Sequence, residues 1–389
     1  MVAGKDIVSK DKRAEDAVKN IYVDDSCTCK THLGNQPFFS IVLPVYGVED
    51  YVANALEDLE AQSFTDWEAI IVDDCSPDGS RAVAEVYVAK DSRFRIVSHE
   101  VNRGLSAARN TGLQAAHGEY VWFPDPDDRY EHDLLQQVAD SLKRQKSPVV
   151  VIGHSEEYYS SMGENIRSVD FALENTELNQ KELRALVMQL EKKTQYGYAW
   201  NKLYERNYLI NGGYRFVEGL PLIEDIEFNV RVFQDLSQLN LLGKPLYHYA
   251  KREKSNLTNK FVPHYYEVHR QRIQLLRDQQ ESWGLLDEEV KSTLGMLFAR
   301  YILSALERNC EPQSGMTRKQ QIQWCKEVFA DPLFGELIPY AKAESAALSV
   351  CLKPLKARNA AQCVLLGRLI YAAKHGFLHD VFVKLKGGR

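Results

Sequence analysis

The sequence lacks the features of several large classes of protein. No apolar run approaches the roughly 18 residues that a membrane-spanning helix needs, and residues 1–20 contain no apolar core of a secretory signal. We therefore expect a cytoplasmic protein. Lys and Arg total 48 against 54 Asp and Glu, which gives a net charge of −6. The whole chain thus has no electrostatic attraction to nucleic acid, and we expect no nucleic-acid partner.

Cysteine is scarce, and its spacing is irregular. An odd count of seven fits neither a disulfide framework nor a zinc ribbon, and Cys27 and Cys29 form a single Cys-x-Cys pair that we interpret as surface thiols. Internal repeats and low-complexity tracts are also lacking. What is present is 44% hydrophobic and 26% charged residues in 389, which is enough for a large packed core and two or three structural units.

Short apolar strands alternate with amphipathic helices in the first part of the chain. Predicted strands lie at 38–45, 68–72, 94–98, 120–123 and 149–152, and predicted helices between them at 48–59, 79–90, 106–117 and 133–146. This alternation is typical of a mainly parallel sheet with helices on both faces. Ligands bind such sheets at the carboxyl ends of the strands.

The later chain has a different pattern. A helix is predicted at 180–191, another begins near Glu224, and from about Tyr265 the sequence indicates helices, for example at 269–282 and 288–308. We divide the chain into a polar N-terminal extension at 1–36, an α/β unit at 37–258 and a helical unit at 259–389.

Aspartates gather where two predicted strands end. Asp73 and Asp74 follow one strand, and Asp125, Asp127 and Asp128 follow another. Aspartate often caps the turn after a strand, which is the simpler interpretation of either cluster alone. Two clusters at one sheet edge would repel each other unless a cation or hydrogen-bond donor groups compensate, and a hard divalent cation prefers such oxygen ligands. We therefore predict a cation site at this edge.

Five segments then carry a resemblance to a known family. In chain order they are FSIVLPVYGVEDYV, AIIVDDCSPDGS, NRGLSAARNTGL, GEYVWFPDPDD and IEDIEF. Over about Phe38 to Thr258 the sequence resembles the family 2 glycosyltransferases, which are inverting enzymes with the GT-A fold. The resemblance implies an α/β GT-A domain with a Rossmann-like, mainly parallel sheet flanked by helices, here followed by a C-terminal α-helical domain. It also implies sugar transfer from a nucleotide diphosphate sugar, usually a UDP-sugar, with Mn²⁺ or Mg²⁺.

The resemblance implies a nucleobase site near the first strand. Pro44, Val45 and Tyr46 resemble the segment beneath the base, with Glu49 nearby. Asp74 resembles the aspartate that receives the imide proton of uracil, and a carboxylate is a suitable acceptor for that N–H donor. The alternative is that the first three residues only form a turn that ends a strand.

The resemblance also implies a diphosphate and metal site. Arg103 falls in the nucleotide-side loop, and Arg109 could approach the diphosphate as a bidentate donor or form an ordinary ion pair. Asp125 and Asp127 match the family's Asp-x-Asp motif, in which Asp127 is the expected direct ligand and Asp125 contacts the ribose or a metal-bound water. His248 is a candidate third ligand, although a lone histidine is more often structural.

Residues of the reacting site follow from the same resemblance. Glu224 and Asp225 match the acidic pair before a helix, in which the aspartate is the catalytic base. An acceptor hydroxyl needs such a carboxylate to take its proton, whereas the simpler interpretation is that both acids favour a helix N-terminus. Trp200 and Lys202 resemble the pocket-lining segment, and Trp200 either stacks on a sugar ring or belongs to the core.

The C-terminal segment is basic. Residues 353–389 contain eight Lys or Arg residues and one acid, Asp380, and an apolar stripe at helical spacing from Leu366 to Leu385. Two interpretations stay open: a helix on an anionic membrane surface, which would make the protein peripheral at the inner membrane face, or a helix packed on the catalytic domain or between subunits of a homo-oligomer.

The resulting hypothesis is a metal-dependent inverting enzyme that transfers a hexose from a UDP-sugar to a hydroxyl of a glycan, lipid-linked or free, in surface polysaccharide synthesis. A catalytically silent sugar-nucleotide-binding or scaffold protein is the alternative. A sugar-phosphate nucleotidyltransferase is disfavoured because residues 44–50 contain one glycine and no basic residue, unlike a triphosphate-binding loop.

Overall fold

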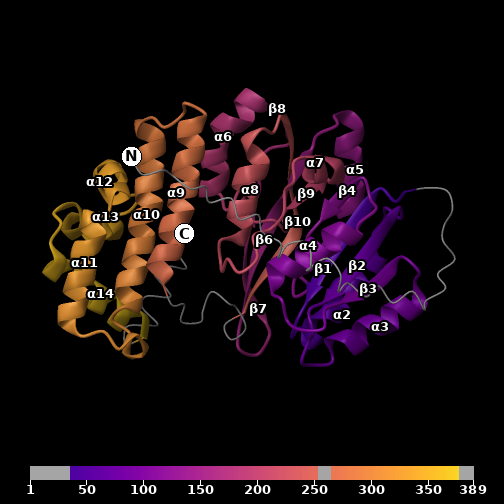
Figure 1. Cartoon of the computed structure of the whole chain (residues 1–389), viewed down its shortest axis with the longest axis horizontal. Coiled ribbons are helices and arrows are strands. Elements are labelled where there is room, and N and C mark those ends of the chain that lie inside the picture. Colours follow the sequence, from indigo (N-terminus) through magenta and orange to yellow (C-terminus); the bar gives the residue numbers. More distant parts are fainter. Residues whose placement is uncertain (1–35, 253–263, 376–389) are drawn as a thin grey trace, which may run out of the picture.

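The computed structural model describes residues 36–252 and 264–375 (Figure 1). The predicted extension at 1–36, apart from its last residue, lies outside the described residues. So do the predicted domain boundary at 258–259 and the end of the basic segment from residue 376.

A ten-stranded mixed sheet forms the centre of the first part of the chain. Its strands are β1 (Phe39–Val45), β2 (Trp67–Asp73), β3 (Phe94–Ser98), β4 (Tyr120–Trp122), β5 (Arg129–Tyr130), β6 (Val149–Tyr159), β7 (Asn165–Phe171), β8 (Thr176–Asn179), β9 (Lys202–Glu205) and β10 (Gln238–Arg252). The order is β3-β2-β1-β4-β9-β6-β10-β5, with β7 on β6 and β8 on β10. The first four strands are parallel, β9 is antiparallel to both its neighbours, and β6 is parallel to β10. The predicted α/β fold is confirmed.

Helices cover both faces of the sheet, and they therefore bury β1 and its neighbours on both sides. The helices are α2 (Glu49–Glu60), α3 (Ser80–Lys90), α4 (Leu105–Ala115), α5 (Leu134–Arg144), α6 (Gln180–Lys192), α7 (Arg206–Asn211) and α8 (Glu224–Gln234). Along β1, Ile41 and Leu43 join one apolar cluster with α2 and α5, whereas Val42 joins a second cluster with α4, α6 and α8. This alternation follows from the period of two in a strand.

The later chain is helical, as predicted. It contains α9 (Tyr265–Ser282), α10 (Glu288–Arg308), η3 (Pro312–Ser314), α11 (Arg318–Ala330), α12 (Pro332–Leu337), η4 (Ile338–Tyr340), α13 (Ala346–Lys356) and α14 (Ala360–His375). These helices stand beside α6 and α8 (Figure 1). Ile273 and Leu276 of α9 belong to the same apolar cluster as Val42 of β1. The helices therefore extend the core of the α/β part rather than forming a separate core.

The described part of the basic segment is packed on protein. In α14, Cys363 and Val364 are buried, and Leu366 and Ile370 contact the core. Gly367 lies so close to α10 that an added Cβ would be 2.8 Å from the carbonyl oxygen of Leu306. Of the two interpretations, packing on the rest of the protein is therefore the one that fits the described residues of α14.

Other positions of the predicted apolar stripe do not join the core. Leu369 is 59% exposed, so the stripe does not form one buried face. Its later positions, up to Leu385, lie outside the described residues. Among the helices of the described ranges, none is both long and apolar enough to cross a bilayer.

Candidate active site

The fold brings carboxylates from distant segments to one edge of the sheet. Asp125 lies beyond β4, and Asp225 lies in the first turn of α8. Arg109 of α4 joins them: its Nη1 donates to Oδ1 of Asp225, and its Nη2 donates to Oδ1 of Asp125 at 3.0 Å. The structure therefore brings the predicted catalytic base, Asp225, and a predicted metal-site residue, Asp125, to one guanidinium.

Arg109 itself is buried, with 1% of its surface exposed. Its guanidinium also lies over the ring of Phe216, 5.2 Å from the centroid. The two nearby carboxylates raise the pKa of Arg109 although burial acts in the opposite direction, so it stays charged. Of the two predicted roles, bidentate donor to a diphosphate or ion pair, the structure shows the ion pair, and it is a buried rather than a surface pair.

Asp225 is held at both carboxylate oxygens. Oδ1 accepts from Arg109, and Oδ2 accepts from the backbone N–H of Ala199 at 2.9 Å. Its position in the first turn of α8 is favourable because the positive end of the helix dipole stabilises a carboxylate. Ala199 was not predicted as a site residue, since a backbone donor leaves no signal in the side-chain pattern.

Glu224 lies beside Asp225 but is held differently. Its Oε2 is buried and has no hydrogen-bond partner among the described residues. Burial, together with the charge of Asp225, raises the pKa of Glu224 to about 7, against the lowering effect of Arg109. The Oε2 atom of Glu224 is therefore a buried acceptor that no described donor uses.

The Asp-x-Asp motif forms a turn between β4 and β5. Asp125 has 26% of its side chain exposed and Asp127 36%. Burial raises the pKa of both, and for Asp125 the charges of Asp127 and Asp225 add to the effect, so its pKa rises to about 7. Arg252 lies 3.5 Å from Asp127. This accumulation of carboxylates favours a cation in the vicinity.

Asp128 has a structural role. It is 1% exposed, and its oxygens accept from the Tyr247 hydroxyl at 2.6 Å and from the Ala250 N–H at 2.8 Å. The same Tyr247 hydroxyl accepts from the backbone N–H of Asp125 at 3.1 Å. Asp128 thus links the Asp-x-Asp motif to β10 and helps to orient Asp125 and Asp127.

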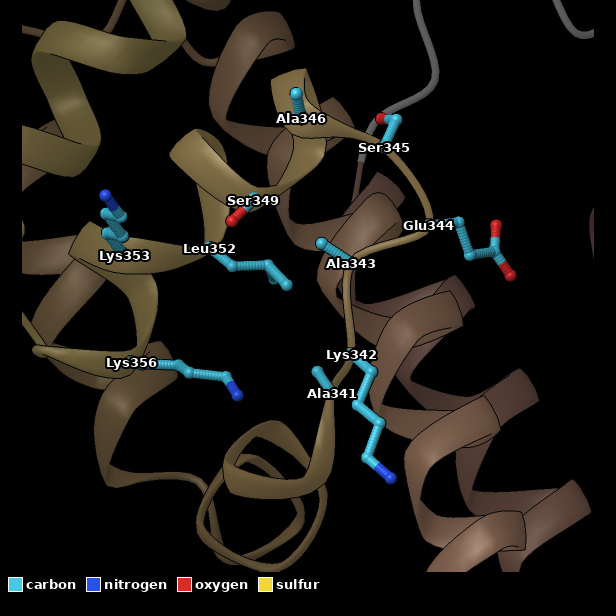
Figure 2. Close-up of a pocket in the computed structure, with 10 residues that line it drawn as sticks. All are labelled: Ala341, Lys342, Ala343, Glu344, Ser345, Ala346, Ser349, Leu352, Lys353 and Lys356. Carbon is cyan, nitrogen blue, oxygen red and sulfur yellow. The ribbon is translucent and has the colours of Figure 1, made fainter.

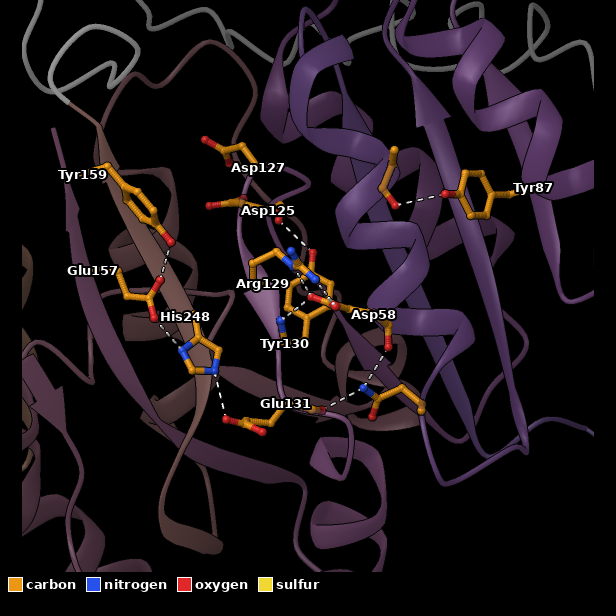
Figure 3. A network of polar contacts seen from close by, with 12 residues as sticks. Asp58, Tyr87, Asp125, Asp127, Arg129, Tyr130, Glu131, Glu157, Tyr159 and His248 are labelled. Atoms are coloured by element: carbon orange, nitrogen blue, oxygen red, sulfur yellow. Dashed lines mark hydrogen bonds and ion pairs between the residues drawn. The ribbon is translucent and has the colours of Figure 1, made fainter. Parts of the chain in front are cut away.

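His248 does not join the Asp-x-Asp motif. Its Nδ1 lies 3.1 Å from Glu157 and its Nε2 3.1 Å from Glu131, so both ring nitrogens face carboxylates (Figure 3). Within the described ranges, no group of three or more His, Cys, Asp or Glu residues is arranged to hold a metal ion. The geometry matches the structural interpretation of His248 rather than a ligand set with Asp125 and Asp127.

Asp74 organises the loop after β3. Its carboxylate accepts from the backbone N–H groups of Arg103 at 2.8 Å and Gly104 at 2.7 Å, and it lies 2.6 Å from Nδ1 of His99. Gly104 has a φ of +87°, which favours glycine. Asp74 is 3% exposed. It therefore shapes the predicted nucleotide loop in this structure, and the predicted contact with uracil stays a prediction.

The other predicted nucleobase residues surround the end of β1. Pro44 and Val45 lie in the strand and Tyr46 follows it with 50% of its surface exposed, which leaves its ring free to cover a base. Glu49 accepts from the Gly79 N–H at 2.8 Å and so joins the beginnings of α2 and α3. Arg103 reaches Glu218 at 3.4 Å on the surface.

Lys202 and Trp200 are interior residues. Nζ of Lys202 donates to the carbonyl oxygens of Gln195 at 2.8 Å and Tyr198 at 2.6 Å, and burial lowers its pKa to about 7. Trp200 is 2% exposed and stacks on Tyr247 at 4.4 Å. The core interpretation of Trp200 is correct. The ammonium group of Lys202 is used inside the protein, and the predicted part of Lys202 in the pocket for the donor stays a prediction.

Comparisons with known proteins agree with the fold. Residues 40–212 match the family model described as glycosyl transferase family 2. The chain is 31% identical over 220 residues to the uncharacterized glycosyltransferase EpsJ of Bacillus subtilis, covering 56% of this chain and 62% of that protein. It is 29% identical over 238 residues to the poly(ribitol-phosphate) beta-N-acetylglucosaminyltransferase TarS of Staphylococcus aureus, covering 60% and 39%. The chain thus spans less than two thirds of these relatives.

A solved structure supports the same assignment at the level of the fold. Residues 1–349 of S. aureus TarS, in complex with UDP-GlcNAc, superpose with a TM-score of 0.57 at 22% identity, covering 86% of this chain and 91% of that one. At this identity the similarity supports the fold alone. Residues 40–212 thus match glycosyl transferase family 2, and the fold of the described chain is the GT-A fold of TarS.

Proposed function

We propose that the protein is an inverting glycosyltransferase that moves a hexose from a UDP-sugar to a hydroxyl of a glycan. The observation that carries the proposal is the position of Asp225, held by Arg109 and the Ala199 N–H beside the carboxylates of the Asp-x-Asp motif. An enzyme of this type needs a base on the acceptor side and a cation site on the donor side.

Asp225 is the proposed base. Each of its oxygens accepts one hydrogen bond and keeps a second lone pair, so the carboxylate can still accept the acceptor's proton. The acceptor oxygen then bonds to the anomeric carbon as the bond from that carbon to the phosphate oxygen breaks. The proton ends on Asp225, and the electron pair of the broken bond leaves with UDP. Attack opposite the leaving group inverts the anomeric configuration.

Asp125 and Asp127 are the residues that would hold Mn²⁺ or Mg²⁺. Both side chains are partly exposed, and their mutual repulsion is relieved by a cation. Mg²⁺ is commonly bound through one or two carboxylates plus substrate phosphates, which fits this pair without a third protein ligand. Such an ion neutralises the developing charge of the diphosphate.

The donor and acceptor are proposed from chemistry and from relatives. UDP as the donor nucleotide is supported by the solved complex of TarS with UDP-GlcNAc and by the loop that Asp74 organises. A polymeric acceptor that bears hydroxyl groups is supported by the name of TarS, a poly(ribitol-phosphate) transferase, and TuaG is named as a putative glycosyltransferase of teichuronic acid biosynthesis. We propose a glycan acceptor, lipid-linked or free. Surface polysaccharide synthesis is the corresponding setting.

The test is a panel of UDP-sugars with glycan acceptors, scored by UDP release with and without Mn²⁺. We expect Asp225→Asn to lower kcat at least about 100-fold, because general-base catalysis contributes roughly 10² to 10⁴. Asp235→Asn, at the exposed C-terminal end of the same helix, is the matched control and should keep full activity. Full turnover by Asp225→Asn would remove it as the base.

We further propose that the C-terminal helices contact an anionic membrane surface. What supports this is a cavity of about 670 Å³ before and along α13, lined by Lys342, Lys353 and Lys356 (Figure 2). Leu365 and Leu369 are exposed on the adjoining α14. Apolar side chains beside lysines are typical of peripheral membrane contacts.

Sedimentation with vesicles that contain phosphatidylglycerol tests this contact. Replacement of Lys342, Lys353 and Lys356 by Glu should abolish binding, whereas the same change at Lys143 and Lys146 near α5 should not. Equal sedimentation of both variants would refute the contact.

A further inference from the structure

We propose that α9 is a positioning element of the active site, in which Arg272 and Gln279 hold the backbone donor that orients the catalytic base. The inference rests on the proposed role of Asp225. It concerns the loop at residues 193–201, between α6 and β9, which we call the base loop because its Ala199 N–H donates to Asp225 at 2.9 Å.

The base loop cannot hold this donor in place by regular structure, since it lies between a helix and a strand. Lys202 fixes two residues of the loop, since its Nζ donates to the carbonyl oxygens of Gln195 and Tyr198 at 2.8 and 2.6 Å. A second donor, Nδ2 of Asn229 in α8, reaches the Tyr198 carbonyl at 3.1 Å. The backbone N–H of Lys202 also donates to the Ala199 carbonyl at 3.1 Å, and none of these donors comes from α9.

Gln279 of α9 holds the loop at a further residue, Tyr196. Its Oε1 accepts from the Tyr196 hydroxyl at 2.7 Å, and its Nε2 donates to the carbonyl of Val230 in α8 at 2.8 Å. Tyr196 is fully buried and Gln279 is 3% exposed. One amide therefore connects the base loop to the helix that begins with Glu224 and Asp225.

Arg272, two turns earlier on α9, secures the entry to the loop. Its Nη2 donates to Oε1 of Glu191 at 2.6 Å, at the end of α6. Burial alone would lower the pKa of Arg272, but the nearby Glu191, whose side chain is 3% exposed, raises it, so Arg272 stays charged. The guanidinium also lies against Gly197 of the base loop, where an added Cβ would be 2.7 Å from Nη2.

The consequence is that the catalytic unit extends beyond the sheet. The family match ends at residue 212, and α9 begins at Tyr265, yet two of its side chains fix the loop that orients Asp225. Displacement of reacting groups by about 1 Å can cost about 100-fold in rate. Arg272 and Gln279 contact no reacting atom, so they act through the base loop.

The test compares Arg272→Met with Arg270→Met in the full chain. Arg270 is the matched control because it lies on the same helix and pairs with Asp331, the N-cap residue of α12, with Nη2 3.0 Å from Oδ1. We expect Arg272→Met to lower kcat about 10-fold or more, with the KM for the UDP-sugar changed less than about twofold. Arg272→Lys should recover part of kcat, and Arg270→Met should keep it.

Amide hydrogen exchange tests whether α9 holds the base loop, without relying on activity. Peptides covering residues 193–201 should exchange at least about tenfold faster in Arg272→Met and unchanged in Arg270→Met. Gln279→Met, which keeps the pair with Glu191, is the second variant and should give the same result. Unchanged exchange in both variants, or an equal loss of kcat in Arg270→Met, would overturn the inference. If the wild type transfers no sugar, the proposed function fails, and exchange still decides whether α9 holds the loop.

Discussion

Replacing Arg109 by Met tests the electrostatic arrangement of the site most directly. The substitution removes the cation that Asp125 and Asp225 share and leaves two carboxylates facing each other next to Glu224. Arg109 is 1% exposed, so solvent offers little compensation. Removing one partner of a buried ion pair costs about 3 to 5 kcal/mol, and we expect a loss of this size in the free energy of unfolding.

The kinetic effect distinguishes the two roles considered for Arg109. A donor to the diphosphate would mainly raise the KM for the UDP-sugar. A residue that holds the base should mainly lower kcat, by about 100-fold, because general-base catalysis contributes roughly 10² to 10⁴. Arg109→Lys should be intermediate, since one ammonium group cannot reproduce the two-pronged contact of a guanidinium.

Urea unfolding and steady-state kinetics on the same preparations provide the measurement. Arg93→Met is the control, because Arg93 forms an ion pair with Asp91 at 2.6 Å next to β3, and its side chain is 27% exposed. Its loss should cost at most about 1 kcal/mol. An Arg109→Met protein with normal stability and normal kcat would refute the arrangement described for the site.

Three further outcomes follow from the structure. The pKa of Asp125 and of Glu224 is raised to about 7, chiefly by burial, so between about pH 4 and 7 the folded protein holds protons that the unfolded chain has released. Urea titrations should therefore show the free energy of unfolding falling as pH rises through this interval, and Asp125→Asn should reduce the slope. Lys202→Met should cost about 1 to 3 kcal/mol in the same assay, since it removes one of the two donors from each of the carbonyls of Gln195 and Tyr198. Asp74→Ala should raise the KM for the UDP-sugar about tenfold by releasing the N–H groups of the nucleotide loop, and an unchanged KM would separate that loop from the donor site.

Local sequence patterns predicted the elements whose formation depends on nearby residues. The strand at 38–45 and the helices at 180–191 and 288–308 appear as β1, α6 and α10 within a few residues. Their hydrophobic periodicity reports directly which side is buried. The antiparallel β9 was missed, since its four residues lie within a polar and aromatic stretch without clear alternation.

Side-chain roles were predicted less well where they depend on partners far along the chain. The family resemblance placed Arg109 near the diphosphate and Lys202 in a segment that lines the acceptor or donor pocket. In the structure both are enclosed by the protein, one with Asp225 and one with the carbonyls of the base loop. A sequence motif records a residue's type and spacing, whereas its exposure depends on how the remaining chain covers it.

The sequence by itself determined the resemblance to the family, the α/β alternation and the presence of acidic residues at the strand ends, because these depend on short-range patterns. Only the tertiary structure decided which carboxylates share the guanidinium of Arg109, which N–H orients Asp225, and that α9 supports the base loop. The physical reason is that these contacts join segments between 16 and 116 residues apart, and only the packed core brings such segments within hydrogen-bonding distance.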